Sequence, residues 1–101
     1  MGWIRSSDGK FLINLNNIIA LGIDRYELTT LDEDEKIDIY RIIAETYCGN
    51  CGESEHEYCI GDFYTTREAA LEELSRIERW LEKGAQGVFQ VDCDNNAARE
   101  I

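Results

Sequence analysis

The sequence predicts an α+β domain in which one long amphipathic helix packs on a curled antiparallel sheet of five to six strands. Short apolar runs separated by turn residues between residues 3 and 64 predict most of the strands. Apolar residues at helical spacing between Thr66 and Lys83 predict the helix. The length of 101 residues allows one domain. We expect it to cover residues 1–92, followed by a polar tail at 93–101.

The N-terminal segment predicts a β-hairpin and a third strand. Trp3 to Arg5 is apolar and extended, and the following Asp8-Gly9 pair tolerates the positive φ that a tight turn needs. The apolar pattern resumes at Phe11 to Leu15 and, after asparagines typical of turns, again at Ile18 to Ile23. These segments supply three of the expected strands.

The middle of the chain predicts two further strands. The acidic stretch from Leu31 to Lys36 is expected to be a solvated loop. Ile37 to Tyr47 is rich in Ile and Tyr and partly alternates, which indicates a long strand packed on one face. A helix is the alternative there, but no capping residue precedes it. Tyr58 to Tyr64 is the fifth predicted strand.

The predicted helix has signals at both ends. Thr65 as N-cap and Glu68 three residues later form the pattern of a capping box. Gly84 can adopt the positive φ of a residue that follows a helix. The residues expected to face the core are Ala70, Leu74, Ile77 and Leu81. A last short strand is expected at Val88 to Val91.

The charge balance excludes several kinds of partner. With 21 Asp and Glu against 10 Lys and Arg, the net charge is −11. Nucleic acid and anionic membranes would therefore be repelled, and we expect neither direct nucleic-acid binding nor membrane binding. No apolar run reaches eighteen residues and no signal-peptide pattern opens the chain, so a cytoplasmic location is expected. The expected partner is an unidentified protein. A homodimer with Tyr64 and Trp80 at its interface is an alternative, although aromatic residues at helical spacing are more often core residues.

A cluster of cysteines and the single histidine is the candidate site. Its members follow the spacing Cys-x2-Cys-x4-His-x2-Cys and are Cys48, Cys51, His56 and Cys59. Three thiolates and one imidazole suit a tetrahedral structural zinc. Clustered cysteines in a reducing cytoplasm are more often metal ligands or redox groups than disulfides. Free thiols in an exposed loop and a Cys48–Cys59 disulfide are the alternatives.

Catalytic roles for the same cluster are disfavoured. A redox centre of the thioredoxin type needs its Cys-x-x-Cys at a helix N-terminus, and no helix is predicted after Cys51. A nucleophile formed by Cys59 and His56 would lack a third residue to orient the imidazole. We therefore expect no catalytic residues and no cofactor other than zinc, and Cys93, in the tail, is expected to have no role.

Three segments, "WIRSSDGKFLINLNNI", "IGDFYTTREAALEELSRIERWL" and "GVFQV", resemble a loose group of short uncharacterised proteins from bacteria and their prophages. That group shares a "DG…INL" opening and an "LGEY.T.EEA" entry to the helix. The resemblance implies the fold and a bacterial or phage origin, and it implies no activity. The chain departs from the group at the link that carries the cysteines, which is usually short there.

Three function classes follow, in order of preference. The first is a non-catalytic protein-interaction module stapled by structural zinc, because no catalytic pair and no phosphate-binding glycine loop is found. The second is an acidic phage-type inhibitor that mimics DNA and occupies a nucleic-acid enzyme. The third is a small enzyme, which would need a pocket that so small a domain has little room to form.

Overall fold

A computed structural model describes residues 2–29, 35–46 and 56–93 of the chain. Within these ranges it contains six strands, one α-helix and one short 3-10 turn. In chain order these are β1 (Gly2–Arg5), β2 (Leu12–Asn14), the 3-10 turn (Leu15–Asn17), β3 (Ile18–Thr29), β4 (Lys36–Thr46), β5 (His56–Tyr64), α1 (Arg67–Glu82) and β6 (Gly87–Gln90). The predicted α+β class, with a helix packed on strands, is confirmed. α1 is neither long nor apolar enough to cross a membrane, and it is the one α-helix of the described part.

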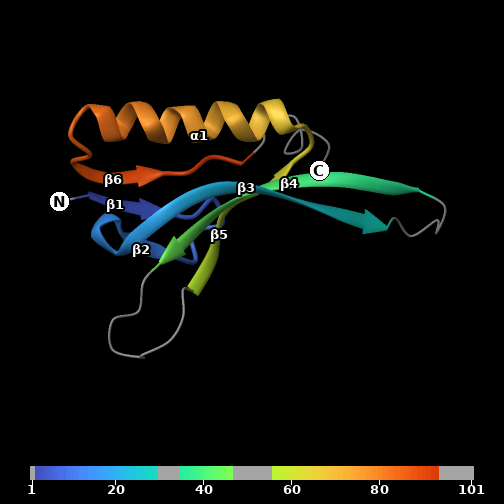
Figure 1. Cartoon of the computed structure of the whole chain (residues 1–101), viewed down its shortest axis with the longest axis horizontal. Helices are drawn as coiled ribbons and strands as arrows, with labels where there is room; N and C mark the ends of the chain where they lie inside the picture. The colour runs from blue at the N-terminus through green and yellow to red at the C-terminus, as the bar shows by residue number, and fades with distance from the viewer. Residues whose placement is uncertain (1, 30–34, 47–55, 94–101) are drawn as a thin grey trace.

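The strands form two three-stranded sheets, in the orders β2-β1-β6 and β3-β4-β5, and not the one curled sheet that the sequence predicts. All pairs are antiparallel except β1 with β6, which run parallel. The chain leaves the first sheet at the 3-10 turn, where the Asn14 side chain accepts a hydrogen bond from the Asn16 amide at 3.0 Å. Figure 1 shows α1 along one side of the strands, with the β3–β4 hairpin extending beyond one end of the helix.

The core lies between α1 and the strands of both sheets. Its fully buried members come from β1, β4, β5 and α1 and are Ile4, Ile42, Ala44, Ile60, Ala70 and Ile77. On β4 the buried Ile42 and Ala44 alternate with residues that are partly exposed. The predicted strand from Ile37, packed on one face, is therefore confirmed as far as Thr46, and Tyr47 lies outside the described residues.

The strand boundaries differ from the prediction most clearly at β3 and β4. β3 runs to Thr29, beyond the predicted end at Ile23, because its pairing with β4 continues as far as Thr29 and Lys36. Lys36, predicted in the acidic loop, is the first residue of β4. Residues 30–34 and most of the predicted tail, 94–101, lie outside the described ranges.

The helix cap lies one residue later than predicted. The Thr66 hydroxyl, and not that of Thr65, accepts the hydrogen bond from the Ala69 amide at 3.1 Å. Thr66 has the extended backbone of an N-cap (φ −131°, ψ 154°), so Glu68 stands too close in sequence to complete a capping box. Gly84, at φ 100°, ends the helix as predicted.

The buried face of α1 also differs from the predicted one. Ala70 and Ile77 are fully buried as predicted, and Leu74 is partly buried. Leu81 is 38% exposed, and Glu73 is buried in place of a hydrophobic residue.

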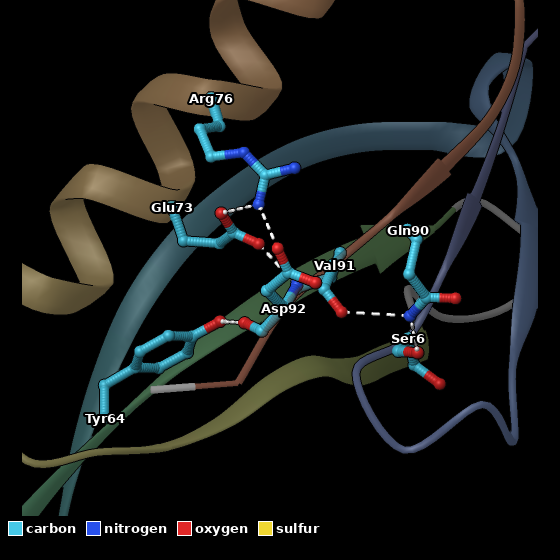
Figure 2. Close-up of polar contacts among 7 residues, drawn as sticks. All are labelled: Ser6, Tyr64, Glu73, Arg76, Gln90, Val91 and Asp92. Atoms are coloured by element: carbon cyan, nitrogen blue, oxygen red, sulfur yellow. Dashed lines mark hydrogen bonds and ion pairs between the residues drawn. The ribbon is translucent and has the colours of Figure 1, made fainter. Parts of the chain in front are cut away.

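Glu73 can be buried because it has partners on α1 and on the segment that follows β6, as Figure 2 shows. Its carboxylate accepts a hydrogen bond from the Asp92 amide and pairs with Arg76 at 2.7 Å. Arg76 also contacts the Asp92 carboxylate at 2.6 Å, and the Tyr64 hydroxyl donates to the Asp92 carbonyl. Burial raises the pKa of Glu73, although both hydrogen-bond partners oppose the shift. This network fixes the segment that follows β6 against α1 and β5.

Candidate functional site

The predicted zinc ligands are divided between described and undescribed parts of the chain. Cys48 and Cys51 lie outside the described residues. His56 and Cys59 both lie on β5, where His56 stands opposite Thr46 and Cys59 opposite Ile43. Residues three apart in a regular strand occupy opposite faces, so these two positions belong to different faces of the sheet. The four-residue zinc set stays a prediction, and no group of three metal-binding side chains occurs within the described ranges.

Cys59 is half-buried in its strand. Its Sγ lies 3.4 Å from the Gly61 carbonyl oxygen, to which the thiol donates. Burial, reinforced by the Asp62 carboxylate, raises the pKa of Cys59 to about 11. The thiol is therefore protonated near neutral pH. Cys93 is exposed at the end of the described segment.

A groove of about 560 Å³ lies on the side of β5 that carries His56. It runs between the first hairpin and the paired ends of β4 and β5. Its lining residues are Trp3, Lys10, Phe11, Leu12, Ile13, Asn14, Asn17, Thr46, His56 and Tyr58, and we call it the Trp3–Tyr58 groove. The rings of Phe11 and Tyr58 meet edge to face, with their centroids 5.3 Å apart.

The walls of the groove combine apolar side chains with a few polar groups. Phe11 is 39% exposed and Leu12, its neighbour, is 49% exposed. The asparagine amides and the His56 imidazole supply hydrogen-bonding groups. None of the ten described residues that line the groove is Asp or Glu, although the chain has 21 of them. Such a mixture is typical of sites that bind an apolar group and orient it with a few polar contacts.

The turn of the first hairpin positions Phe11 and Leu12, the two exposed apolar residues of the groove wall. Ser6 is fully buried, and its hydroxyl accepts from the Phe11 amide at 3.0 Å while donating to Asp8 at 2.6 Å. Gly9 adopts φ 75°, as the predicted Asp8-Gly9 turn requires. The turn therefore positions the Phe11 ring against the ring of Tyr58. Sequence reasoning identified this turn and missed the groove, because its other wall comes from residues more than thirty positions later.

A second polar cluster lies on the face of the β3–β4–β5 sheet where Cys59 stands. The Tyr26 hydroxyl donates to Asp62 at 2.8 Å, and the Arg41 guanidinium lies 4.9 Å above the Tyr26 ring. Arg41 also pairs with Asp24 at 2.9 Å. Burial and the bond to Asp62 raise the pKa of Tyr26 to about 12. The sequence offered no signal for this cluster, since its members come from three strands.

Comparison with known proteins identifies no relative: no family model, no curated protein and no solved structure matches the chain.

Proposed function

We propose that the protein is a non-catalytic interaction module that binds an apolar segment of a partner protein in the Trp3–Tyr58 groove. The observation that carries this proposal is the aromatic lining of the groove, which has no Asp or Glu among its described residues, in a chain of net charge −11. Exposed apolar patches bordered by polar groups are typical of protein-binding surfaces. The rest of the surface, being acidic, favours a partner that is neutral or basic.

The side chains of the groove support binding more than catalysis. His56 is exposed, and its imidazole has no hydrogen-bond partner among the described residues. The half-buried Cys59 occupies the opposite face of β5, with its pKa raised, so the two do not form an activated pair in this arrangement.

The arrangement of carboxylates favours this proposal over the DNA mimic. A mimic needs its carboxylates on one face at the spacing of phosphates. The exposed helix carboxylates, Glu68, Glu72, Glu78 and Glu82, lie on α1, which covers one side of the sheet. Glu45 on β4 and Glu57 on β5 are paired with each other and lie on the side of the β3–β4–β5 sheet away from α1. The acidic residues are therefore distributed around the molecule.

The test immobilises the wild-type protein and two matched variants, and compares which proteins each of them retains from an extract of the source cell. Leu12→Ser removes an exposed apolar side chain from the groove, and Leu71→Ser removes one of similar exposure (40%) from α1. We expect one or more proteins to be retained by wild type and by Leu71→Ser and lost by Leu12→Ser. Equal retention by all three, or retention by none, would overturn the proposal.

A further inference from the structure

The outer edge of β3 has no strand beside it in the described part of the chain. β3 is the first strand of the order β3-β4-β5 and pairs with β4 alone. Its residues 18–23 carry no charge, and none of its twelve residues is buried. Long apolar edges of this kind present unpaired backbone groups and are templates for an added strand.

A hollow of about 290 Å³ lies on the face of the sheet beside this edge. It is bordered by residues 20–24 of β3 and by Ile43, Glu45 and Glu57. The hollow exists because the residues of β3 opposite Ile43 and Glu45 are Gly22 and Ala20, the two smallest. A Cβ atom added at Gly22 would meet no atom within 4 Å.

Two uncompensated carboxylates border the hollow. Glu45 stands directly opposite Glu57 in the pairing of β4 with β5, an arrangement in which like charges repel. Neither residue has an ion pair within the described ranges, and the nearby Arg41 is engaged by Asp24. A positive charge brought into the hollow would relieve this repulsion.

We propose that the β3 edge accepts an extended, basic segment of a partner protein as an added strand. Its backbone would pair with residues 18–24, and a Lys or Arg side chain would pass over Gly22 and Ile43 to the carboxylates of Glu45 and Glu57. A second copy of this chain fits less well, because β3 offers Arg25 as its single cation and the two chains would each carry −11. This site is independent of the Trp3–Tyr58 groove and of the function proposed for it.

The test uses a synthetic nine-residue peptide that alternates Lys with Val or Thr, and measures its binding by fluorescence anisotropy and by amide shifts in NMR spectra. We expect binding that weakens with added salt and shifts concentrated on residues 18–24. Replacing Glu45 and Glu57 together by Gln should weaken binding by about tenfold. Replacing Glu68 and Glu72 on α1 by Gln changes the net charge equally and should leave binding within about twofold, because these residues lie far from the edge.

A variant that changes no charge separates strand addition from general attraction. Gly22→Val fills the hollow with a side chain that its surroundings and backbone accept, so the fold should be kept and the peptide excluded. Unchanged binding by Gly22→Val, or an equal loss from the two double variants, would overturn the proposal. Self-association through β3 that strengthens with salt would also overturn it, since a second copy would then occupy the edge.

Discussion

The hydroxyl of Tyr64 donates a hydrogen bond to the main-chain carbonyl of Asp92, 28 residues later in the sequence. This contact ties the segment after β6 to the end of β5. Tyr64→Phe should therefore lower the free energy of unfolding by about 1 kcal/mol, the usual net value of one hydrogen bond. Urea denaturation measures this change in the free energy of unfolding.

Tyr58→Phe is the control, because the Tyr58 hydroxyl has no hydrogen-bond partner in the described residues and its loss should change stability little. Equal effects of the two variants would contradict the role assigned to the Tyr64 contact.

The buried face of α1 is tested by a pair of truncations. Ile77 is fully buried and Leu81 is 38% exposed. Ile77→Ala should cost about 2–5 kcal/mol, since it removes buried methyl groups and leaves a cavity. Leu81→Ala should cost less, about 1 kcal/mol, because more than a third of the Leu81 surface is already in water. A larger effect at Leu81, measured by thermal or urea unfolding, would restore the helix face predicted from the sequence.

The errors in predicting α1 have identifiable causes. Thr65 and Thr66 are equally good caps, and Glu68 favoured the wrong one because a capping box was assumed. Glu73 was not counted as a core residue, since its burial depends on Asp92, nineteen residues later. The existence and length of the helix were predictable because they depend on local spacing alone.

A close approach between Gly61 and Tyr64 predicts the effect of adding one methyl group. A Cβ at Gly61 would lie 2.6 Å from the Tyr64 hydroxyl oxygen, which the bond to Asp92 holds in place. Gly61→Ala should therefore cost about 1–3 kcal/mol through overpacking. Gly22→Ala is the matched change in open space, and it should stabilise the strand by roughly 0.5 kcal/mol. Denaturation of both variants measures the difference, and the same sign at both positions would contradict the packing described.

The pKa of Glu73 predicts a pH dependence of stability. Because burial raises this pKa, the folded state binds more protons at Glu73 than the unfolded state once the pH exceeds the unfolded pKa. The contribution of Glu73 to stability is therefore highest at acid pH and falls as the pH rises through the folded pKa. Compared with Glu73→Gln, the wild type should lose relative stability between about pH 4 and about pH 7. Urea melts at both values measure this, and an opposite trend would show that Arg76 dominates.

The division into two sheets and the position of the groove could not be predicted from local patterns. Each strand of the first hairpin is visible in the sequence, but the parallel pairing of Ile4 with Phe89 joins residues more than eighty positions apart. The Trp3–Tyr58 groove and the hollow beside Gly22 are also formed by residues far apart in the sequence. They could not be predicted because they depend on the registers of β4 and β5. Alternation within a strand predicts which face a residue occupies and not which neighbour it meets.

The cysteine cluster can now be tested more sharply than the sequence allowed. The spacing predicts one structural zinc per chain, whereas the register of β5 places His56 and Cys59 on opposite faces. If one ion bound both, the first residues of β5 would have to change their pairing with Thr46 and Ile43. Zinc binding should therefore shift the NMR signals of these two residues as well as those of the ligands.

The last prediction follows from the thiol of Cys59. With its pKa raised to about 11, Cys59 should be alkylated slowly near neutral pH in metal-free protein, and faster as the pH approaches that value. The zinc hypothesis expects about one zinc per chain by elemental analysis, lost in Cys51→Ser and kept in Cys93→Ser. The zinc affinity should fall steeply as the pH drops, because the thiols must lose protons to bind the ion. Chelation should leave unfolding cooperative, because Ile4, Ile42 and Ile77 form the core without the cluster. Zinc that binds without protecting Cys59 from alkylation would remove Cys59 from the ligand set. Protein that refuses added zinc would leave the free thiols and the Cys48–Cys59 disulfide as the alternatives.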